Sequence, residues 1–247
     1  MMRELNEMAA RVEQAGFAVV PGVLEEETVR RAVAALERAE SHAEICAGAR
    51  RRVGRLYALR NLLNAVPELR ELIERTRARA LASRVLGARA FIVRGILFDK
   101  TAEANWKVAW HQDLSIAVRA RRDAEGFGGW SEKAGVVHVQ PPAGVLERMV
   151  SVRLHLDACD EENAPLKVVP GSHLRGRLSA EAIAHALERA TAVSCVVPRG
   201  GALLMRPLLL HASSALRAPS QRRRRVVHLE FAAAALPAGL EWSSGTN

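Results

Sequence analysis

Short runs of β-branched or alternating apolar residues follow one another after residue 90, and they limit the possible folds more than any other feature of the sequence. The runs are FIVRGILF, WHQDLSIAV, VSVRLHL, LKVVP, VSCVV, ALLM and RVVHLEF. Runs of this length, bounded by turn residues, predict β-strands. Several short strands in regular succession indicate a barrel or a sandwich, so we expect an α+β fold with a mainly β core.

Residues 1–88 have a different pattern, which predicts a helical scaffold beside that core. Apolar residues recur at helical spacing from Leu5 to Val12, and a short strand, GFAVVPG, and a second helix, EEETVRRAVAALERAE, follow. A third helix is expected from Pro67 to about Gly87. Later in the chain, Ser179 is placed to cap a helical insert, SAEAIAHALERA.

The segment 119–147 lacks a clear strand or helix pattern. It is rich in Gly and Pro and contains Phe127, Trp130 and His138, which predicts a functional loop or lid. No internal repeat or low-complexity linker divides the chain. Residues 1–247 are therefore expected to form one domain, with the scaffold in 1–88 and the β core in 89–247.

Three residues have the types and the spacing that a metal requires. His111 and Asp113 are two positions apart in WHQDLSI, so on a strand both side chains project from one face. An imidazole nitrogen and a carboxylate oxygen on one face can hold a metal and leave its other side open. His211, which follows ALLMRPLLL, is the candidate third ligand at a strand end. The residues alone leave another interpretation open, an ordinary strand pair and a histidine that bonds a backbone carbonyl.

Four stretches occur in an order that is more specific than any one of them. They are GFAVVPGVLEEETV, WHQD, HLDACDEENAPLKVVPGSHLRG, and GGALLMRPLLLHASS followed by RRVVHLEF. In this order the chain resembles the phytanoyl-CoA dioxygenase family of iron(II)- and 2-oxoglutarate-dependent oxygenases. The resemblance implies a double-stranded β-helix (a jelly-roll, cupin-like barrel) with flanking N-terminal helices. It also implies His111, Asp113 and His211 as the iron ligands, with His211 preferred to His173 or His228.

The chain departs from the family pattern at two turns. Asn163-Ala164-Pro165 stands where members often have Asn-Gly, and Gly200-Gly201 replaces the usual Gly-Asp. Neither departure changes a metal ligand. Halogenating relatives have a small residue in place of the carboxylate, so the presence of Asp113 favours hydroxylation.

The resemblance also implies an arginine on the last strand that binds the distal carboxylate of 2-oxoglutarate, since a planar guanidinium suits a carboxylate. Counting back seven residues from Phe231 selects Arg224, with Arg222 as the alternative; at least two of the four arginines 222–225 are expected to be solvated surface charges. Ser213 and Arg153 correspond to further cosubstrate contacts.

Other polar residues have two interpretations each. His155 shares a strand face with Arg153 and belongs either to the site or to the core as a hydrogen-bonded histidine. Arg60 and Asn61 either line the pocket or form a turn. Gln112 is expected to support the ligands from the opposite face, and residues 170–173 to form a structural turn.

Composition and charge indicate which binding partners to expect. The net charge of +9 comes almost entirely from arginines scattered among glutamates, so nucleic-acid binding is not expected. No long apolar run or signal peptide pattern is present, which predicts a cytoplasmic protein without a membrane span. Cys46, Cys159 and Cys195 lack metal or redox spacing and are expected to be buried thiols.

The function expected is therefore oxidation of a small molecule by iron(II), 2-oxoglutarate and O₂, with hydroxylation and release of succinate and CO₂. The alternatives are a cupin-like metal-dependent isomerase or lyase without 2-oxoglutarate and a barrel without catalysis. Most of the aromatic surface, available for the substrate or for the core, comes from Trp106, Trp110, Phe127 and Trp130. The sequence predicts neither the substrate nor the oligomeric state.

Overall fold

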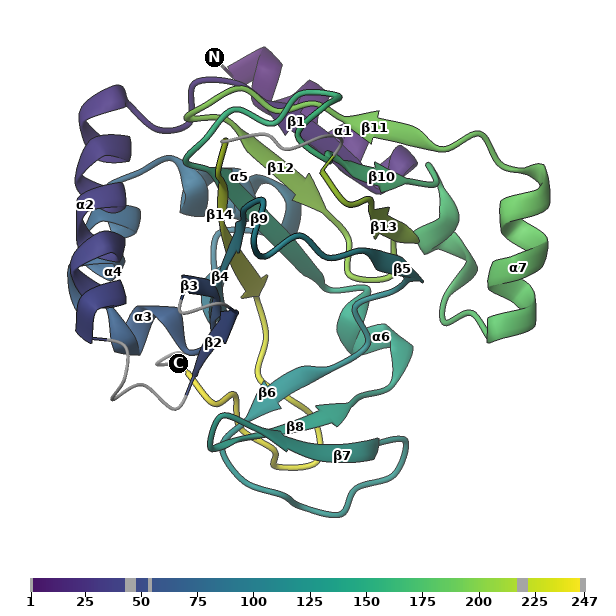
Figure 1. The fold of residues 1–247 in the computed structure, drawn as a ribbon. Coiled ribbons are helices and arrows are strands. Elements are labelled where there is room, and N and C mark those ends of the chain that lie inside the picture. Colours follow the sequence, from purple (N-terminus) through teal and green to yellow (C-terminus); the bar gives the residue numbers. More distant parts are fainter. Residues whose placement is uncertain (1, 43–47, 53–54, 217–221, 245–247) are drawn as a thin grey trace.

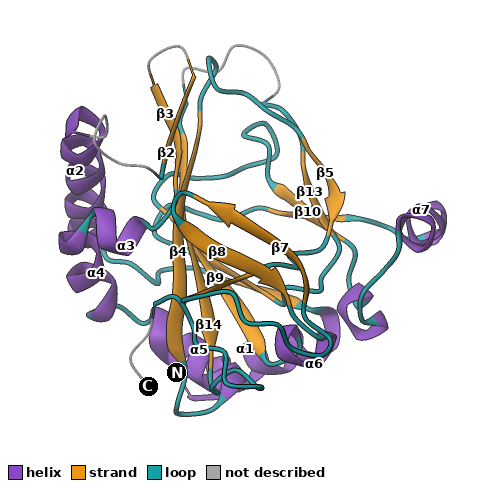
Figure 2. Ribbon diagram, turned by 90° about the horizontal axis from the view of Figure 1, so that it is seen from below, coloured by secondary structure: helices purple, strands orange, loops and turns teal. Residues whose placement is uncertain are grey.

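The computed structural model describes residues 2–42, 48–52, 55–216 and 222–244. Two antiparallel sheets, one large and one small, lie opposite each other, and a third small sheet lies beside them (Figures 1 and 2). Helices cover the outer face of the large sheet (Figure 2). The mainly β core expected from the strand runs is therefore present.

The large sheet has seven strands, and its centre is built from the longest apolar runs. In spatial order they are β1 (Phe17–Val20), β12 (Ala202–Met205), β9 (Met149–His155), β14 (Arg224–Ala232), β4 (Phe91–Lys100), β3 (Arg55–Leu59) and β2 (Ala49–Arg52). Residues far apart in the sequence are thus neighbours: Arg224 pairs with Lys100, and Glu230 pairs with Arg94. The β2–β3 hairpin was not predicted, because its arginine-rich run does not have the apolar pattern of a strand.

The opposing sheet has four strands, all of them short. In spatial order they are β11 (Val193–Cys195), β10 (Leu166–Val168), β13 (His211–Ser213) and β5 (Val108–His111). Strands β11, β10 and β5 overlap runs expected from the sequence, whereas β13 lies outside them and begins at His211.

The segment 119–147 is more regular than the sequence indicated. It contains a hairpin of β7 (Gly128–Lys133) and β8 (Val136–Gln140), and α6 (Ala143–Leu146); β8 pairs in turn with β6 (Ile116–Val118). The hairpin turn places Ala134 and Gly135 at φ values of 57° and 74°. Turns with two positive φ values usually carry Asn-Gly or Asp-Gly, so the Ala-Gly pair gave no hairpin signal.

Helices α1 (Met2–Ala15), α2 (Glu26–His42), α3 (Leu62–Ala65), α4 (Pro67–Glu74) and α5 (Ala78–Leu86) pack on the large sheet, and α7 (Ala180–Arg189) lies apart from it in Figure 2. The prediction of one helix from Pro67 to Gly87 was wrong, because the chain breaks between α4 and α5. Thr76 donates to the carbonyl of Ile73 (2.7 Å) and accepts from the amide of Ala78 (3.2 Å). Such local side-chain bonds compete with a continuous helix. The cap predicted for α7 is confirmed, since Ser179 accepts from the amide of Ala182.

Strand alternation divides the residues of the large sheet between two environments. On β14, Val227, Leu229 and Phe231 pack in the hydrophobic cluster with the helices. Arg224 and His228, which alternate with them, line a pocket between the sheets. Alternate residues of the same strand therefore face the hydrophobic core and the pocket.

Two further expectations concern the cysteines and the membrane. Cys159 and Cys195 are buried free thiols, as predicted, whereas Cys46 lies outside the described residues. In the part of the chain that the structure describes, no helix combines the length and the apolar character that a membrane crossing requires.

Candidate active site

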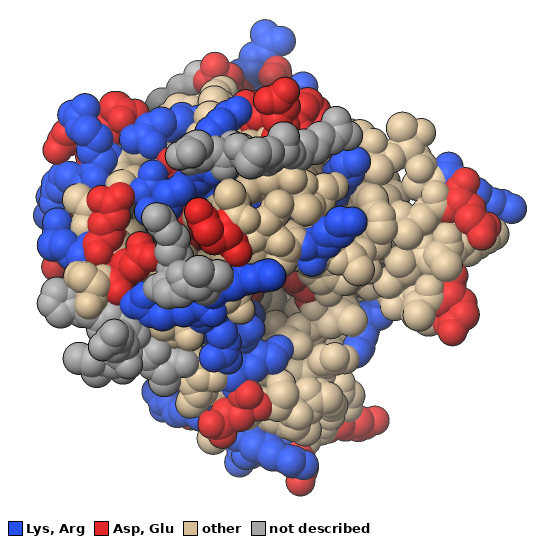
Figure 3. All heavy atoms as spheres, in the orientation of Figure 1, with Lys and Arg blue, Asp and Glu red and all other residues tan. Residues whose placement is uncertain are grey.

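A pocket of about 470 Å³ lies between the seven-stranded and the four-stranded sheet and takes its lining from both of them and from the β7–β8 hairpin. That volume is within the range of about 300–1,000 Å³ usual for small-molecule sites. The charged lining consists of two carboxylates and five cations: Asp113, Glu230, Arg60, Arg94, Lys133, Arg153 and Arg224. In Figure 3 a recess near the centre of the face has Lys and Arg side chains gathered on its left and lower side. The pocket is thus predominantly cationic.

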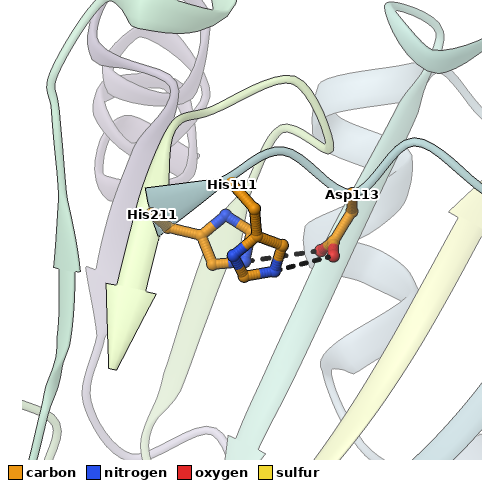
Figure 4. Close-up of side chains that lie close together, drawn as sticks. All are labelled: His111, Asp113 and His211. Atoms are coloured by element: carbon orange, nitrogen blue, oxygen red, sulfur yellow. Dashed lines mark ion pairs between the residues drawn. The ribbon is translucent and has the colours of Figure 1, made fainter. Parts of the chain in front are cut away.

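His111, Asp113 and His211 come together on one wall of this pocket (Figure 4). The two histidines are register partners on the paired strands β5 and β13, with ring centroids 4.2 Å apart. Each imidazole Nε2 lies 3.7 Å from a different carboxylate oxygen of Asp113. One ligand atom from each residue lies within 4.8 Å of the others, which is close enough to share one ion.

The sequence selected Asp113 on an incorrect geometric ground. Strand β5 ends at His111, so Asp113 lies beyond the strand and does not share its face through alternation. Its position depends on the backbone instead, since its amide donates to the carbonyl of Pro207 (2.9 Å). Gln112 donates to the carbonyls of Gly176 (2.8 Å) and Leu208 (2.7 Å) and fixes the same segment, in the supporting role predicted for it.

The surroundings of the two histidines select one tautomer for each ring. Nδ1 of His111 lies 2.8 Å from the carbonyl of Ala109, and Nδ1 of His211 lies 2.9 Å from the carbonyl of Leu209. A carbonyl only accepts, so Nδ1 carries the hydrogen and the neutral ring keeps a lone pair on Nε2. Both lone pairs are therefore available beside Asp113, as a metal site requires.

The charges of Asp113 and His211 are also those of a metal site. Burial opposes ionisation of Asp113, but the neighbouring His211 and His111 hold the pKa of its carboxyl well below the usual range. Burial lowers the pKa of His211 to about 4, so that this ring is neutral at pH 7. A carboxylate and a neutral imidazole are the forms that bind metal.

The turn at residues 170–173 has the structural role predicted for it. The hydroxyl of Ser172 accepts from the amide of Leu210 (2.8 Å), next to His211. The ring of His173 lies 3.0 Å from the carbonyl of Glu13. His173 therefore takes no part in the ligand cluster, and its turn holds the start of β13 in place.

Two buried cations meet at the hydroxyl of Ser213. The ammonium of Lys100 donates to this hydroxyl (3.0 Å) and to the carbonyl of Ser214 (2.7 Å), and Arg224 approaches the same hydroxyl at 3.5 Å. Arg224 also donates to the carbonyl of Ala164, and its Nε has no partner among the described residues. Burial and the charge of Arg224 lower the pKa of Lys100 to about 7. We name Lys100, Ser213 and Arg224 the inner cation pair site.

The sequence did not identify Lys100. It follows Asp99 at the end of a strand run, where a charged pair normally indicates the return to solvent, yet its exposed fraction is 0%. Its pairing with Arg224 across β4 and β14 depends on long-range register, which the sequence alone does not give.

The other three arginines of the run 222–225 have acidic partners. Arg222 pairs with Asp160 at the surface, Arg223 with Asp99 and Glu40, and Arg225 with Asp157 and Glu37. The expectation that at least two of the four are solvated was wrong: the exposed fractions of the Arg223 and Arg225 side chains are only 26% and 12%. Their partners come from distant parts of the chain.

Arg153 lines the pocket, and its guanidinium donates to Nδ1 of His228 (2.8 Å); its contact with 2-oxoglutarate stays a prediction. Burial lowers the pKa of Arg153 to about 10. His155 is buried with neither ring nitrogen bonded to a described residue, so it is not the hydrogen-bonded core histidine considered above. Burial and the charge of Arg153 hold its pKa well below the usual value, which keeps the ring neutral.

The remaining predictions for the pocket were right in part. Arg60 lines it, whereas Asn61 has a φ of 54° and donates to the carbonyl of Ala134 (3.2 Å), as a turn residue. Of the four aromatic residues proposed, Trp106 lines the pocket, and the other three pack against hydrophobic clusters. Phe98, which the sequence analysis did not select, also lines it.

Solved structures share this architecture. The epimerase SnoN, in complex with Fe³⁺, alpha ketoglutarate and nogalamycin RO, gives a TM-score of 0.72 at 19% identity and covers 100% of this chain and 97% of that chain. The carbocyclase SnoK from nogalamycin biosynthesis gives 0.69 at 19%, covering 93% and 84%. EctD from S. alaskensis, with 2-oxoglutarate and 5-hydroxyectoine, gives 0.69 at 19%, covering 92% and 75%. These likenesses confirm the predicted jelly-roll fold.

Sequence comparison gives the family. Curated proteins include no significant match to the chain. The family model described as phytanoyl-CoA dioxygenase (PhyH), however, matches residues 12–225. This match includes the three clustered side chains and Arg224, and it covers most of the sequence. The chain belongs to the phytanoyl-CoA dioxygenase family.

Proposed function

We propose that this chain is an iron(II)- and 2-oxoglutarate-dependent dioxygenase that hydroxylates a small molecule. One observation carries the proposal: two histidines and one carboxylate form a cluster in a pocket that also contains buried cations without a carboxylate partner. The first feature suits a metal, and the second suits an acidic cosubstrate. SnoN and EctD, which share the fold, are structures with alpha ketoglutarate or 2-oxoglutarate bound.

The three clustered side chains fit iron(II). His111 and His211 present Nε2 lone pairs, and Asp113 presents two oxygens whose only side-chain ion-pair partners among the described residues are these two rings. Two imidazoles and one carboxylate on one side of an ion are the donor set of non-haem iron oxygenases. These residues would hold the metal and leave its remaining positions facing the pocket.

The inner cation pair site fits the distal carboxylate of 2-oxoglutarate. Lys100 and Arg224 are both buried and have no acidic hydrogen-bond or ion-pair partner among the described residues. Burying a cation without a counter-charge is costly, so an anion at this position is stabilising. The hydroxyl of Ser213 lies between the two cations and can donate to the same carboxylate.

When bound, iron and 2-oxoglutarate would use O₂ to oxidise a C–H bond of the substrate, and 2-oxoglutarate would be converted to succinate and CO₂. The protein supplies geometry. Backbone carbonyls orient His111 and His211, Gln112 fixes the segment that carries Asp113, and Ile96 and Phe98 exclude water from one wall. A cupin-like isomerase or lyase needs no cationic site for a second carboxylate, so the inner cation pair site favours the dioxygenase.

The test is spectroscopic. Anaerobic protein with iron(II) is expected to develop a weak visible charge-transfer band when 2-oxoglutarate is added, because the 2-oxo acid end chelates the metal. Succinate, which lacks the 2-oxo group, is the control and is expected to give no band. Wild-type protein that binds iron(II) but gives no band with 2-oxoglutarate contradicts the proposed function.

The pKa of Lys100 predicts a pH dependence of cosubstrate binding. This amine has a pKa of about 7 before an anion binds, so it is largely neutral at pH 9. A carboxylate favours the charged form and raises the pKa, so binding takes up a proton above pH 7. We expect the dissociation constant of 2-oxoglutarate to rise by up to about tenfold per pH unit above pH 7.

Calorimetric titration of the iron(II) protein with 2-oxoglutarate between pH 7 and pH 9 measures this dependence. Lys100→Met is the matched variant, since it keeps the length of the side chain and removes the charge. It is expected to bind more weakly at pH 7 and to lose most of the pH dependence. A variant with the same slope as the wild type assigns the dependence to another group.

A further inference from the structure

The pocket contains a second group of cations, which have no part in the proposed binding of iron or 2-oxoglutarate. Arg60 follows β3, Arg94 lies on β4, and Lys133 ends β7, and all three line the pocket. We name them the outer cation group. Three different elements converge to form it.

The outer group lies far from the inner cation pair site. Arg94 pairs with Glu230, and Lys100 pairs with Arg224, on the same two strands. The two pairs lie six positions apart on each strand, which corresponds to about 20 Å between their backbone positions at the rise of an extended chain. A five-carbon dicarboxylate bound at Arg224 does not span this distance. The outer group is therefore available to a different molecule.

The outer group has more positive charge than its surroundings neutralise. Arg94 donates to Glu230 at 3.1 Å, and the exposed fractions of these side chains are 15% and 9%. The side chains of Arg60 and Lys133 make no hydrogen bond or ion pair with any residue that the structure describes. Among the described residues, Glu230 is thus the one carboxylate that forms an ion pair with a member of this group of three cations.

The cations also affect one another. Burial, and then the charge of Arg94, lower the pKa of both Arg60 and Lys133. Like charges that are partly buried side by side destabilise each other, and a bound anion relieves this repulsion. Surface lysines and arginines that point into solvent would not show this coupling.

The arrangement is held in place before any ligand binds. Asn61, next to Arg60, donates to the carbonyl of Ala134, next to Lys133 (3.2 Å). This bond fixes the tip of the β7–β8 hairpin against the end of β3. The pocket also has an apolar and aromatic lining, formed by Ile96, Phe98, Trp106 and Leu114.

We propose that the outer cation group binds an oxyanion of the substrate, a carboxylate or a phosphate ester, and that the apolar wall receives the rest of the molecule beside His111. This inference rests on the proposed function for the identity of the site as catalytic. It assigns the substrate to a chemical class, an organic acid or phosphate with an apolar body. Arg60, Arg94 and Lys133 then determine specificity and do not hold iron or 2-oxoglutarate.

The experiment compares probes that differ in charge. Anaerobic protein loaded with iron(II) and saturating 2-oxoglutarate is titrated calorimetrically with benzoate and benzamide, and with phenyl phosphate and phenol. At least one anion is expected to bind about tenfold more tightly than its neutral counterpart, since a hydrogen bond between charged groups has about that effect. The two pairs distinguish a carboxylate site from a phosphate site.

Substitutions test which residues cause the preference for the anion. Arg60→Gln and Lys133→Gln are each expected to reduce the preference for the anion by about tenfold while the charge-transfer band with 2-oxoglutarate stays unchanged. Lys107→Gln is the matched control, because Lys107 is exposed and does not line the pocket. If Arg60→Gln does not fold, the preference is measured with Lys133→Gln alone, since Lys133 lies at the end of a hairpin strand.

Two results overturn the inference: equal binding of charged and neutral probes, or a preference that survives both substitutions. The proposed function fails in a different way. If the band with 2-oxoglutarate is absent but the preference for the anion is present and depends on Lys133, the anion site stands and the dioxygenase assignment does not.

Discussion

Alanine in place of Asp113 is expected to abolish both the charge-transfer band with 2-oxoglutarate and the release of succinate. The variant keeps two imidazoles, but it loses the only anionic group of the cluster, whose oxygens lie 3.7 Å from both Nε2 atoms. Loss of an outer-shell partner alone costs about 10- to 100-fold in metal affinity or activity. Loss of a direct ligand is expected to cost more than 100-fold.

The measurement is iron(II) binding and succinate release with each protein at the same concentration. Asp123→Ala is the matched control, because Asp123 is an exposed carboxylate in the same segment of the chain and does not line the pocket. Thermal unfolding checks that Asp113→Ala is folded. A folded Asp113→Ala protein that binds iron(II) and 2-oxoglutarate like the wild type contradicts the assignment of Asp113 as a ligand.

The sequence predicted the features of the site that depend on local period. Arg224, selected by its spacing from Phe231 in RRVVHLEF, lies on the face of its strand that lines the pocket. The strand runs themselves were found because they are short β-branched or alternating apolar stretches bounded by turn residues. In each case, the pattern that predicts the feature lies within one short stretch of the sequence.

Features that depend on distant contacts were missed or explained incorrectly. Lys100 lies beside Arg224 and Ser213 because β4 pairs with β14 in one register, and the pattern around Lys100 resembles that of a strand end at the surface. Asp113 was selected through strand alternation, but the strand ends before it and a bond to Pro207 positions it. The outer cation group brings together residues of β3, β4 and β7, and the bond between Asn61 and Ala134 that links two of these elements follows from no local pattern.

Arg224→Ala is expected to raise the 2-oxoglutarate requirement by about 100-fold. The guanidinium is buried, it approaches Ser213 beside Lys100, and its Nε has no partner among the described residues. Removal of one partner of a buried charge pair costs about 2–5 kcal/mol, and each 1.4 kcal/mol corresponds to a factor of ten. The effect is expected in the concentration of 2-oxoglutarate needed for half-maximal turnover.

The matched control for this substitution is Arg222→Ala, two residues away. Arg222 pairs with Asp160 at the surface and does not line the pocket, so its loss is expected to leave the requirement for 2-oxoglutarate within a factor of about three of the wild type, as for an exposed ion pair. Arg224→Lys separates charge from shape, because lysine keeps the charge and loses the two-point contact with a carboxylate. If Arg222→Ala alone raises the requirement, Arg224 is not the cosubstrate residue.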